Sequence, residues 1–264
     1  MSERTDGHTM RGLLATMRNA LAEAGANRRA LWSQMAVMAV NDIVWVAFWV
    51  LFFRRVGTVR GWDGERILLL LAVITTAGGI ALGLLANARR VGTMAVDGQL
   101  DAVLSLPSPP LAYLLLRRVE PIHLGDLAFG LTLFAVAGSP TVERTITFIG
   151  VVAAAATLMT GFLVLTGSLA FFAGRSEGGE LGFHAIVMLG SYPIDVFAGV
   201  AKVVLFTIVP AAFVSSVPAR LIDSFAIGTA LQLGAVAVAF AVAGWGAFTI
   251  GLRRYTSGSV WTRA

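Results

Sequence analysis

Long apolar runs dominate this chain, and short polar segments that carry most of the arginines separate them. Six of the runs are close to the length of about 20 residues that a helix needs to cross the hydrocarbon core of a bilayer. They cover residues 31–53, 67–88, 119–137, 146–172, 183–207 and 227–252. The pattern therefore predicts an all-α integral membrane protein with six transmembrane helices.

The segment between the fifth and sixth runs fits neither a loop nor a span. Residues 208–225 are still apolar but are interrupted by Pro210 and Pro218, which cannot donate helical hydrogen bonds. Irregular backbone at membrane depth is tolerated only where other protein buries it. We therefore expect a re-entrant hairpin or a surface helical cap at this place.

The first thirty residues show a helical pattern of apolar positions and no signal peptide. They carry several arginines and lack an apolar core followed by a cleavage site. The pattern predicts an amphipathic helix that lies on the membrane surface before the first span. The alternative is a tail helix packed on another subunit. The apolar positions are Met10, Leu13, Leu14, Met17 and Leu21, and Arg11 and Arg18 edge them.

The composition supports a membrane protein and excludes other classes. Of the residues, 57% are hydrophobic and 13% are charged, and the mean hydropathy is +0.80. Soluble domains carry about 25% charged residues, and disordered chains are far less hydrophobic. The net charge of +5 reflects basic residues that flank spans, so we expect no nucleic-acid partner. The absence of cysteine excludes disulfides and thiol chemistry.

The arginines outside the predicted spans are distributed unevenly between the two sides of the membrane. One side carries thirteen, namely Arg4, Arg11, Arg18, Arg28, Arg29, Arg89, Arg90, Arg117, Arg118, Arg175, Arg253, Arg254 and Arg263. The other side carries six, namely Arg54, Arg55, Arg60, Arg66, Arg144 and Arg220. Cytoplasmic loops are enriched in basic residues, so both termini are expected in the cytoplasm. In the exceptionally basic first outer loop, we expect Arg54 and Arg55 to meet lipid headgroups, Asp63 or Glu65.

The longest inner segment, residues 89–118, contains a candidate docking element. Its apolar residues Leu100, Val103, Leu104 and Pro107 fall at helical spacing, and the prolines that follow stop the helix. Asp97 and Asp101 lie one turn apart, and Gly98 allows a sharp turn before the helix. The segment predicts a short amphipathic helix at about 94–106. It is either a membrane-surface turn or a contact site for a soluble partner.

Catalytic and nucleotide-binding motifs are missing from the sequence. The single lysine, Lys202, is followed by Val203 and not by serine or threonine, so the sequence contains no phosphate-binding loop motif. No metalloprotease or nucleophile-elbow motif is present. We therefore expect no enzymatic activity in this chain. Glycines within the runs are expected to pack helices closely, and they include Gly79, Gly83, Gly244, Gly246 and Gly251.

Ionisable residues inside the apolar runs are candidate functional residues, because each costs about 2.5–3.5 kcal/mol at the bilayer centre. Asp42 lies in the first run, and Asp195 and Lys202 lie seven residues apart in the fifth. In one helix, that spacing puts them on one face but about 10 Å apart along the axis, too far for direct contact. We expect them to line a polar path or to pair with other helices. The sequence Tyr192-Pro193 should kink the fifth span, and we expect Tyr192 to line the translocation path with the three ionisable residues.

A second group of ionisable residues occurs at the start of the third run. Glu120, His123 and Asp126 are spaced three apart and share a helical face. Three such residues could ligate a metal, but near a helix end they more often form a solvated or partner-facing surface. We therefore predict no metal site.

The order of these features resembles the permease subunits of the ABC transporter type-2 class, in a six-span branch that is uncharacterised or linked to drug and viologen export. The resemblance covers nearly the whole chain. It rests on residues 98–104 with Pro107, on Tyr192-Pro193, on Pro210 to Phe213 with Pro218, and on residues 251–258. It implies an elbow helix within residues 1–30 and a transmembrane domain over 31–252 of the type V exporter kind. It also implies a coupling helix at about 94–106, re-entrant helices between spans five and six, and a cytoplasmic tail over 253–264.

The resemblance further implies an exporter half in the cytoplasmic (inner) membrane. Two permease chains, identical or paralogous, would pair in the lipid, and each would dock a separate ATPase subunit that binds ATP and Mg²⁺. This chain would bind no cofactor and would help to move a lipophilic or amphipathic small molecule. The alternative is a proton-coupled secondary transporter that uses Asp42, Asp195 and Lys202 as relay groups. Such folds show internal repeats, and the two halves of this sequence show none that is clear.

Overall fold

The computed structural model describes residues 2–174 and 177–255, which form helices joined by turns and no sheet. The first half contains α1 (Ser2–Ala26), α2 (Arg28–Val56), α3 (Gly64–Gly78), the π-helical η1 (Gly79–Leu84), the 3-10 helix η2 (Ala86–Arg90), α4 (Val91–Val96), α5 (Asp101–Leu104), α6 (Pro110–Leu116) and α7 (Pro121–Ala137). The second half contains α8 (Val142–Ser168), α9 (Ala170–Ala173), α10 (Gly178–Gly190), η3 (Ile194–Val196), α11 (Gly199–Thr207), α12 (Ala211–Val214), α13 (Ser216–Asp223) and α14 (Ile227–Leu252).

Four helical segments are long and apolar enough to cross a membrane: Arg28–Val56, Gly64–Leu84, Val142–Ala173 and Ile227–Leu252. Two bent pairs qualify if each pair is taken as one span. They are α6 with α7, bent by 79°, and α11 with α12 and α13, bent by 60°. The prediction of an all-helical, multi-pass membrane protein is confirmed, with four to six candidate spans in the described residues.

The prediction of one continuous fifth span over 183–207 is wrong. Helix α10 ends at Gly190, and a turn, η3 and a second turn follow before α11 begins at Gly199. The reason is Pro193, which lacks an N–H and disfavours a helical conformation in the residue before it. The break leaves backbone groups without helical hydrogen bonds. One of them, the Ile194 N–H, donates instead to Ser216 Oγ of α13 at 3.0 Å.

The broken helical segment expected at 208–225 is present. It consists of α12 and α13, which pack on α3, α8 and α10. Most residues of both helices are buried. The irregular backbone around Pro210 and Ser215 is therefore covered by protein, as the sequence pattern required.

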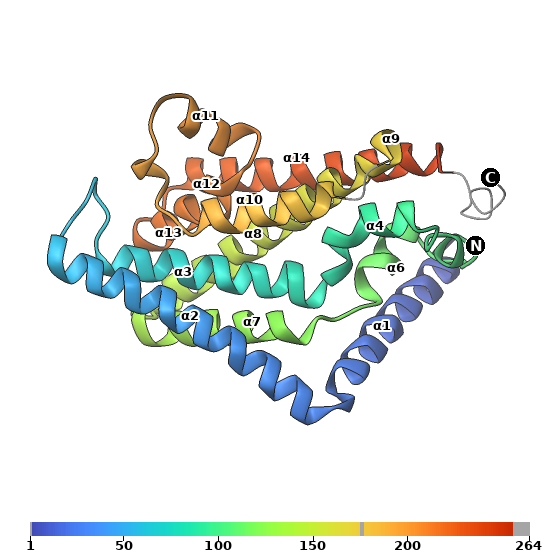
Figure 1. Ribbon diagram of the computed structural model, residues 1–264, viewed down its shortest axis with the longest axis horizontal. Coiled ribbons are helices and arrows are strands. Elements are labelled where there is room, and N and C mark those ends of the chain that lie inside the picture. Colours follow the sequence, from blue (N-terminus) through green and yellow to red (C-terminus); the bar gives the residue numbers. More distant parts are fainter. Residues whose placement is uncertain (1, 175–176, 256–264) are drawn as a thin grey trace.

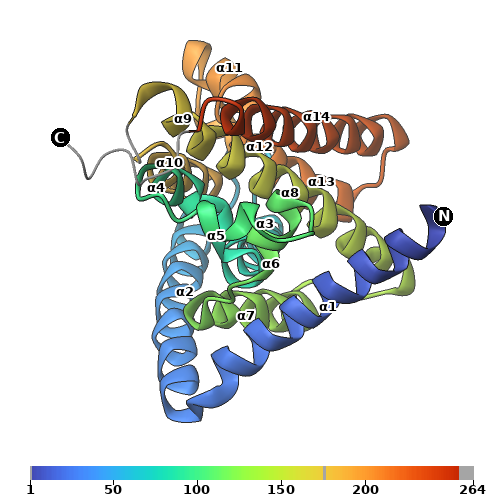
Figure 2. The same cartoon turned by 90° about the vertical axis from the view of Figure 1, so that its right-hand side faces the viewer.

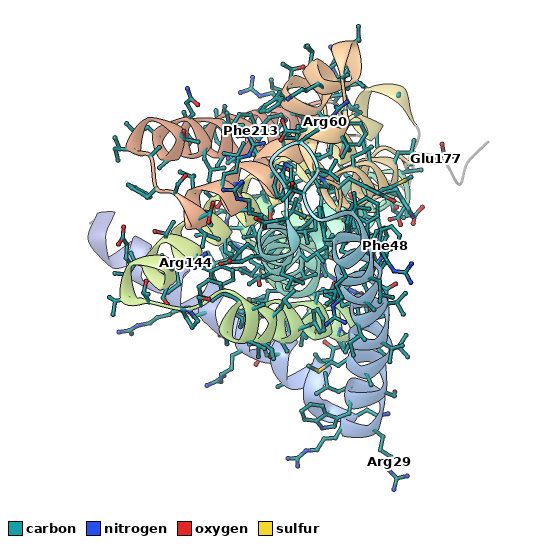
Figure 3. All side chains as sticks on the ribbon, turned by 90° about the vertical axis from the view of Figure 1, so that its left-hand side faces the viewer. Arg29, Phe48, Arg60, Arg144, Glu177 and Phe213 are labelled. Atoms are coloured by element: carbon teal, nitrogen blue, oxygen red, sulfur yellow. The ribbon has the colours of Figure 1, made fainter. Side chains whose placement is uncertain are left out.

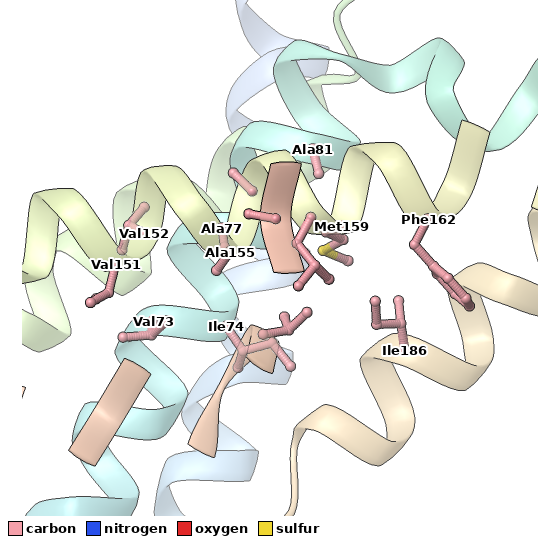
Figure 4. Close-up of a cluster of buried hydrophobic side chains, with 14 of the residues drawn as sticks. Val73, Ile74, Ala77, Ala81, Val151, Val152, Ala155, Met159, Phe162 and Ile186 are labelled. Carbon is pink, nitrogen blue, oxygen red and sulfur yellow. The ribbon is translucent and has the colours of Figure 1, made fainter. Parts of the chain in front are cut away.

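The hydrophobic core lies where α3, α8 and α10 meet (Figure 4). Val73 and Ile74 of α3 face the buried row of α8, and Ile186 closes the cluster from α10. Helix α14 packs on α8 at a glycine contact. A Cβ added at Gly244 would lie 2.5 Å from the Gly161 carbonyl oxygen, so a larger residue would force the helices apart.

Glycines also hold α7 tightly between α2 and α3. A Cβ on Gly79 of η1 would lie 2.4 Å from the backbone of Leu127, and a Cβ on Gly125 would lie 2.7 Å from the Met35 carbonyl oxygen. The expected role of glycine in packing is thus confirmed at Gly79, and also at Gly83, Gly244 and Gly251. It is wrong at Gly246, which has open space around it. These contacts fix the face that α7 presents to its neighbours.

The first helix leaves the bundle at an angle and forms a V with α2 (Figures 1 and 2). Asn27 separates the two helices, and its side chain accepts a hydrogen bond from the Ala30 N–H at 3.1 Å. Helix α1 returns to pack on α6, while Met10, Leu14 and Leu21 remain exposed. The start of α1 and the end of α14 lie at one end of the molecule, with α4 and α6 (Figure 1). Residues 256–264 of the expected tail lie outside the described residues.

Candidate functional site

The predicted docking segment is not one helix over 94–106. Helix α4 ends at Val96, a turn follows, and the single turn of α5 begins at Asp101. Gly98 takes a positive φ of 72° in this turn, a conformation that other residues adopt only at a cost. The sharp turn expected before the helix is therefore present, but it divides the segment into two short helices.

The apolar stripe of this segment divides into buried and exposed residues. Leu100 and Val103 are each 1% exposed and belong to the core of this chain, so the prediction that they contact a partner is wrong. Helical spacing placed them on one face correctly, but that face packs inward. Six of the exposed residues form what we call the α4–α5 surface, namely Val96, Asp97, Asp101, Leu104, Leu106 and Pro107.

The α4–α5 surface is linked to the end of α14. Burial, followed by the neighbouring carboxylate of Asp101, raises the pKa of Tyr255 to about 12. The Tyr255 ring also meets Phe171 edge to face, with 6.3 Å between the ring centroids. A displacement of this surface would therefore reach Tyr255, which follows α14, and through it Phe171 of α9.

Asp195 and Lys202 lie at the opposite end of the molecule from the α4–α5 surface. Because the helix is broken at Pro193, Lys202 Nζ lies 2.8 Å from Asp195 Oδ1, and the predicted separation of the two residues is wrong. Asp195 also accepts hydrogen bonds from Trp62 Nε1, at 2.9 Å, and from Arg220. Arg60 donates to the Asp195 carbonyl oxygen at 2.6 Å. We call these five residues the outer ion cluster, after the side of the membrane that the arginine distribution predicts for them; Arg60 is labelled in Figure 3.

The outer ion cluster keeps Asp195 ionised. Partial burial opposes this, but hydrogen bonds from Lys202 and Trp62 and the charge of Arg220 hold the pKa of Asp195 below its ordinary value. The cluster thereby joins the first outer loop to η3, α11 and α13. It also explains one arginine of the basic loop between α2 and α3, Arg60.

Two further ion pairs surround this cluster. Arg66 contacts Asp223 at 2.9 Å, and Arg144 contacts Glu65 at 3.2 Å. Asp63 accepts from the Arg66 N–H at the start of α3. Asp63 and Glu65 therefore have partners other than the Arg54 and Arg55 that the sequence suggested, and headgroup contact remains the prediction for those two arginines.

Asp42 lies in a partly open cavity of about 90 Å³ between α2, α3, α7 and α10, with the exposed Asn41 in its lining. Across the cavity, His123 Nδ1 lies 2.8 Å from Asp126 Oδ2. His123 is 6% exposed, and Asp42 and Asp126 are each 5% exposed. Asp42 Oδ2 and Asp126 Oδ1 have no hydrogen-bond partner among the described residues.

The expectation that Glu120, His123 and Asp126 form a solvated or partner-facing surface is wrong for two of the three. His123 and Asp126 face inward because Gly125 sets α7 directly on α2. Glu120 lies outside the cavity and pairs with Arg118 at 3.2 Å. In residues 2–174 and 177–255, no group of three acidic, histidine or cysteine residues could hold a metal ion.

Tyr192 connects the cavity region to the outer half of α2. Its ring centroid lies 5.8 Å from that of Trp45, which lines the cavity, and 5.9 Å from that of Trp49. The four predicted path residues are therefore not in one line. Asp42 and Tyr192 lie near the cavity, whereas Asp195 and Lys202 belong to the outer ion cluster.

Sequence reasoning missed the partners of these residues. The His123 and Asp126 pair carried a signal, since the two are spaced by one helical turn and an intramembrane Asp42 requires a polar partner. The partners of Asp195 carried a weaker signal, namely the excess of arginine in the first outer loop. Nothing local in the sequence singles out Trp62.

Apolar helices, glycine contacts and buried charges define a multi-pass membrane protein, and its sequence carries no ATP-binding motif. The chain belongs to the ABC-2 family: the model described as "ABC-2 family transporter protein" matches residues 39–259, which is most of the chain. The family resemblance is thus confirmed. The family consists of membrane permeases that are typically non-catalytic and that generally work with an ATPase subunit. No curated protein and no solved structure matches the chain.

Proposed function

We propose that this chain is the membrane subunit of an exporter in the cytoplasmic membrane, driven by a separate ATPase. Its cargo is a lipophilic or amphipathic small molecule. The observation that carries the proposal is the exposed α4–α5 surface on a chain of the ABC-2 family. A permease without a phosphate-binding loop must receive energy through contact with a partner that binds ATP and Mg²⁺.

The α4–α5 surface is suited to such contact. Leu104, 41% exposed, and Leu106, 38% exposed, supply apolar anchors, and Asp97 and Asp101 can meet basic groups at the rim. The surface also adjoins Tyr255, whose ring meets Phe171 of α9. Motion of the ATPase would therefore reach the segment after α14 and, through it, α9.

The remaining features of the proposed assembly follow the family pattern. Two permease chains pair, each docks one ATPase, six spans cross the membrane, and both termini are cytoplasmic. The proton-coupled alternative gains no support from this geometry. Its relay groups Asp195 and Lys202 form an ion pair in the outer ion cluster instead of lining one path with Asp42.

Copurification with the ATPase tests the docking surface. Truncating a central interface anchor typically costs about 2 kcal/mol, or about 30-fold in affinity. We expect the double change Leu104→Ala with Leu106→Ala to weaken ATPase binding by that order and to abolish cargo-stimulated hydrolysis, with the chain still inserted. Leu231→Ala, at an equally apolar exposed position of α14, is the control. Unchanged ATPase binding in the double variant would refute the assignment.

A further inference from the structure

The cavity around Asp42 has the size of a small head group. Its volume is about 90 Å³, and a water molecule needs about 15 Å³ on this measure, so on the order of six waters would fill it. Its walls include aromatic and aliphatic side chains, among them Trp45, Phe129 and Ile74. The volume is smaller than the roughly 300–1,000 Å³ of a pocket for a drug-sized molecule, and it suits one charged group with short alkyl substituents.

The charges around the cavity do not balance. The two carboxylates, Asp42 and Asp126, come from α2 and α7, and His123 is the one basic residue in the lining. The other polar side chains in the lining are uncharged: Asn41 and Trp45 of α2, Thr75 of α3, and Ser191, which directly follows α10. With both carboxylates ionised, even a charged His123 leaves one negative charge in excess.

The orientation of the carboxylates shows where a cation would bind. His123 occupies one oxygen of Asp126, while the other oxygen and Asp42 Oδ2 are buried and without a hydrogen-bond partner among the described residues. The two acids are close enough to hydrogen-bond to each other when one of them carries a proton, and the Asn41 amide lies beside Asp42. Buried carboxylates that lack a partner are unfavourable unless a cation or a proton neutralises them.

We propose that this cavity binds an alkylammonium group, with its positive charge between Asp42 and Asp126 and its alkyl substituents against Trp45 and Phe129. Aromatic faces attract such cations, and the apolar side chains of the cavity can pack against the alkyl substituents. The proposal rests on the proposed function in one respect: the bound group is taken to be the charged end of the exported molecule. A proton competes for the same two carboxylates, so binding should strengthen as the pH rises.

Equilibrium binding to the purified full-length chain, without ATPase, tests this site. The probe is radiolabelled tetramethylammonium, with uncharged tert-butanol as a competitor of similar size. We expect saturable binding that weakens at least 30-fold in Asp42→Asn and in Asp126→Asn and that tert-butanol does not displace. Ser191→Leu, which fills the cavity without changing its charge, should also abolish binding. Glu65→Gln, in an outer ion pair, should bind as the parent does.

The outcomes separate this site from the proposed function. Unchanged binding in a correctly folded Asp42→Asn chain, or equal displacement by tert-butanol, overturns the site. If an acidic variant does not fold, Ser191→Leu decides the question, and binding retained in that variant also overturns it. Binding that follows the expected pattern while no ATPase copurifies would support the site and overturn the ATPase-driven function.

Discussion

The cavity around Asp42 and the outer ion cluster use the same kind of residue in opposite ways. Asp195 has Lys202, Arg220 and Trp62 as partners and lies near solvent. Asp42 is more deeply buried and has an oxygen with no hydrogen-bond partner among the described residues. A satisfied carboxylate fixes structure, whereas a carboxylate left without a partner in an apolar wall is available for a ligand. The difference separates a structural role from a binding role.

The largest expected effect concerns Trp62, the aromatic centre of the outer ion cluster. Its side chain is almost fully buried, donates to Asp195 and lies under the Arg220 guanidinium, 5.4 Å from the ring centroid. We expect Trp62→Ala to lower the free energy of unfolding by about 3–5 kcal/mol, because it leaves a large cavity and removes a hydrogen bond.

Thermal unfolding in detergent measures this loss. Trp245→Ala is the matched control, since Trp245 is exposed on α14 and its truncation should cost far less. Equal losses in the two variants would mean that the outer ion cluster contributes nothing specific to stability.

The same substitution in the two regions should give different results. Asp195→Asn leaves Lys202 and Arg220 without their anion, and solvent reduces the penalty because both cations are partly exposed. We expect a loss of about 1–2 kcal/mol. Asp42→Asn removes a buried carboxylate beside Asp126, so we expect stability within about 0.5 kcal/mol of the parent or slightly above it.

Parallel unfolding of both variants makes this comparison. A large loss in Asp42→Asn, matching or exceeding that in Asp195→Asn, would show that Asp42 is a structural residue. The binding role of the cavity would then lose its basis.

The sequence predicted best what the lipid environment dictates. The last apolar run, 227–252, coincides with α14, and the first, 31–53, lies within α2. Apolar length determines these helices because every backbone group in a bilayer must be bonded within the segment. The break in the fifth span was harder to predict. Pro193 indicated a kink, but the sequence did not show that Asp195 and Lys202 would then meet residues of the loop between α2 and α3.

The sites were predicted less well, because they depend on contacts between distant segments. Spacing placed Leu100 and Val103 on one face, but spacing does not tell which neighbour that face meets. Asp42 was recognised as unusual, yet its position opposite His123 depends on glycine contacts of α7 with two other helices. The spacing of residues shows which of them share a helix face, whereas the residues that this face contacts depend on how the helices pack.

The smallest expected effect is the response of the outer ion cluster to pH. The pKa of Asp195 is lowered in the folded chain from its ordinary value of 3.8. A lowered pKa contributes stability that is complete above the ordinary value and is lost as the pH falls through the folded value. The stability difference between the parent and Asp195→Asn should therefore be constant from about pH 8 to pH 5 and shrink only in stronger acid.

Unfolding both chains at matched pH values isolates this contribution, because all other titrating groups are shared. A difference that already declines between pH 7 and pH 5 would show that Asp195 is not held ionised by Lys202, Trp62 and Arg220.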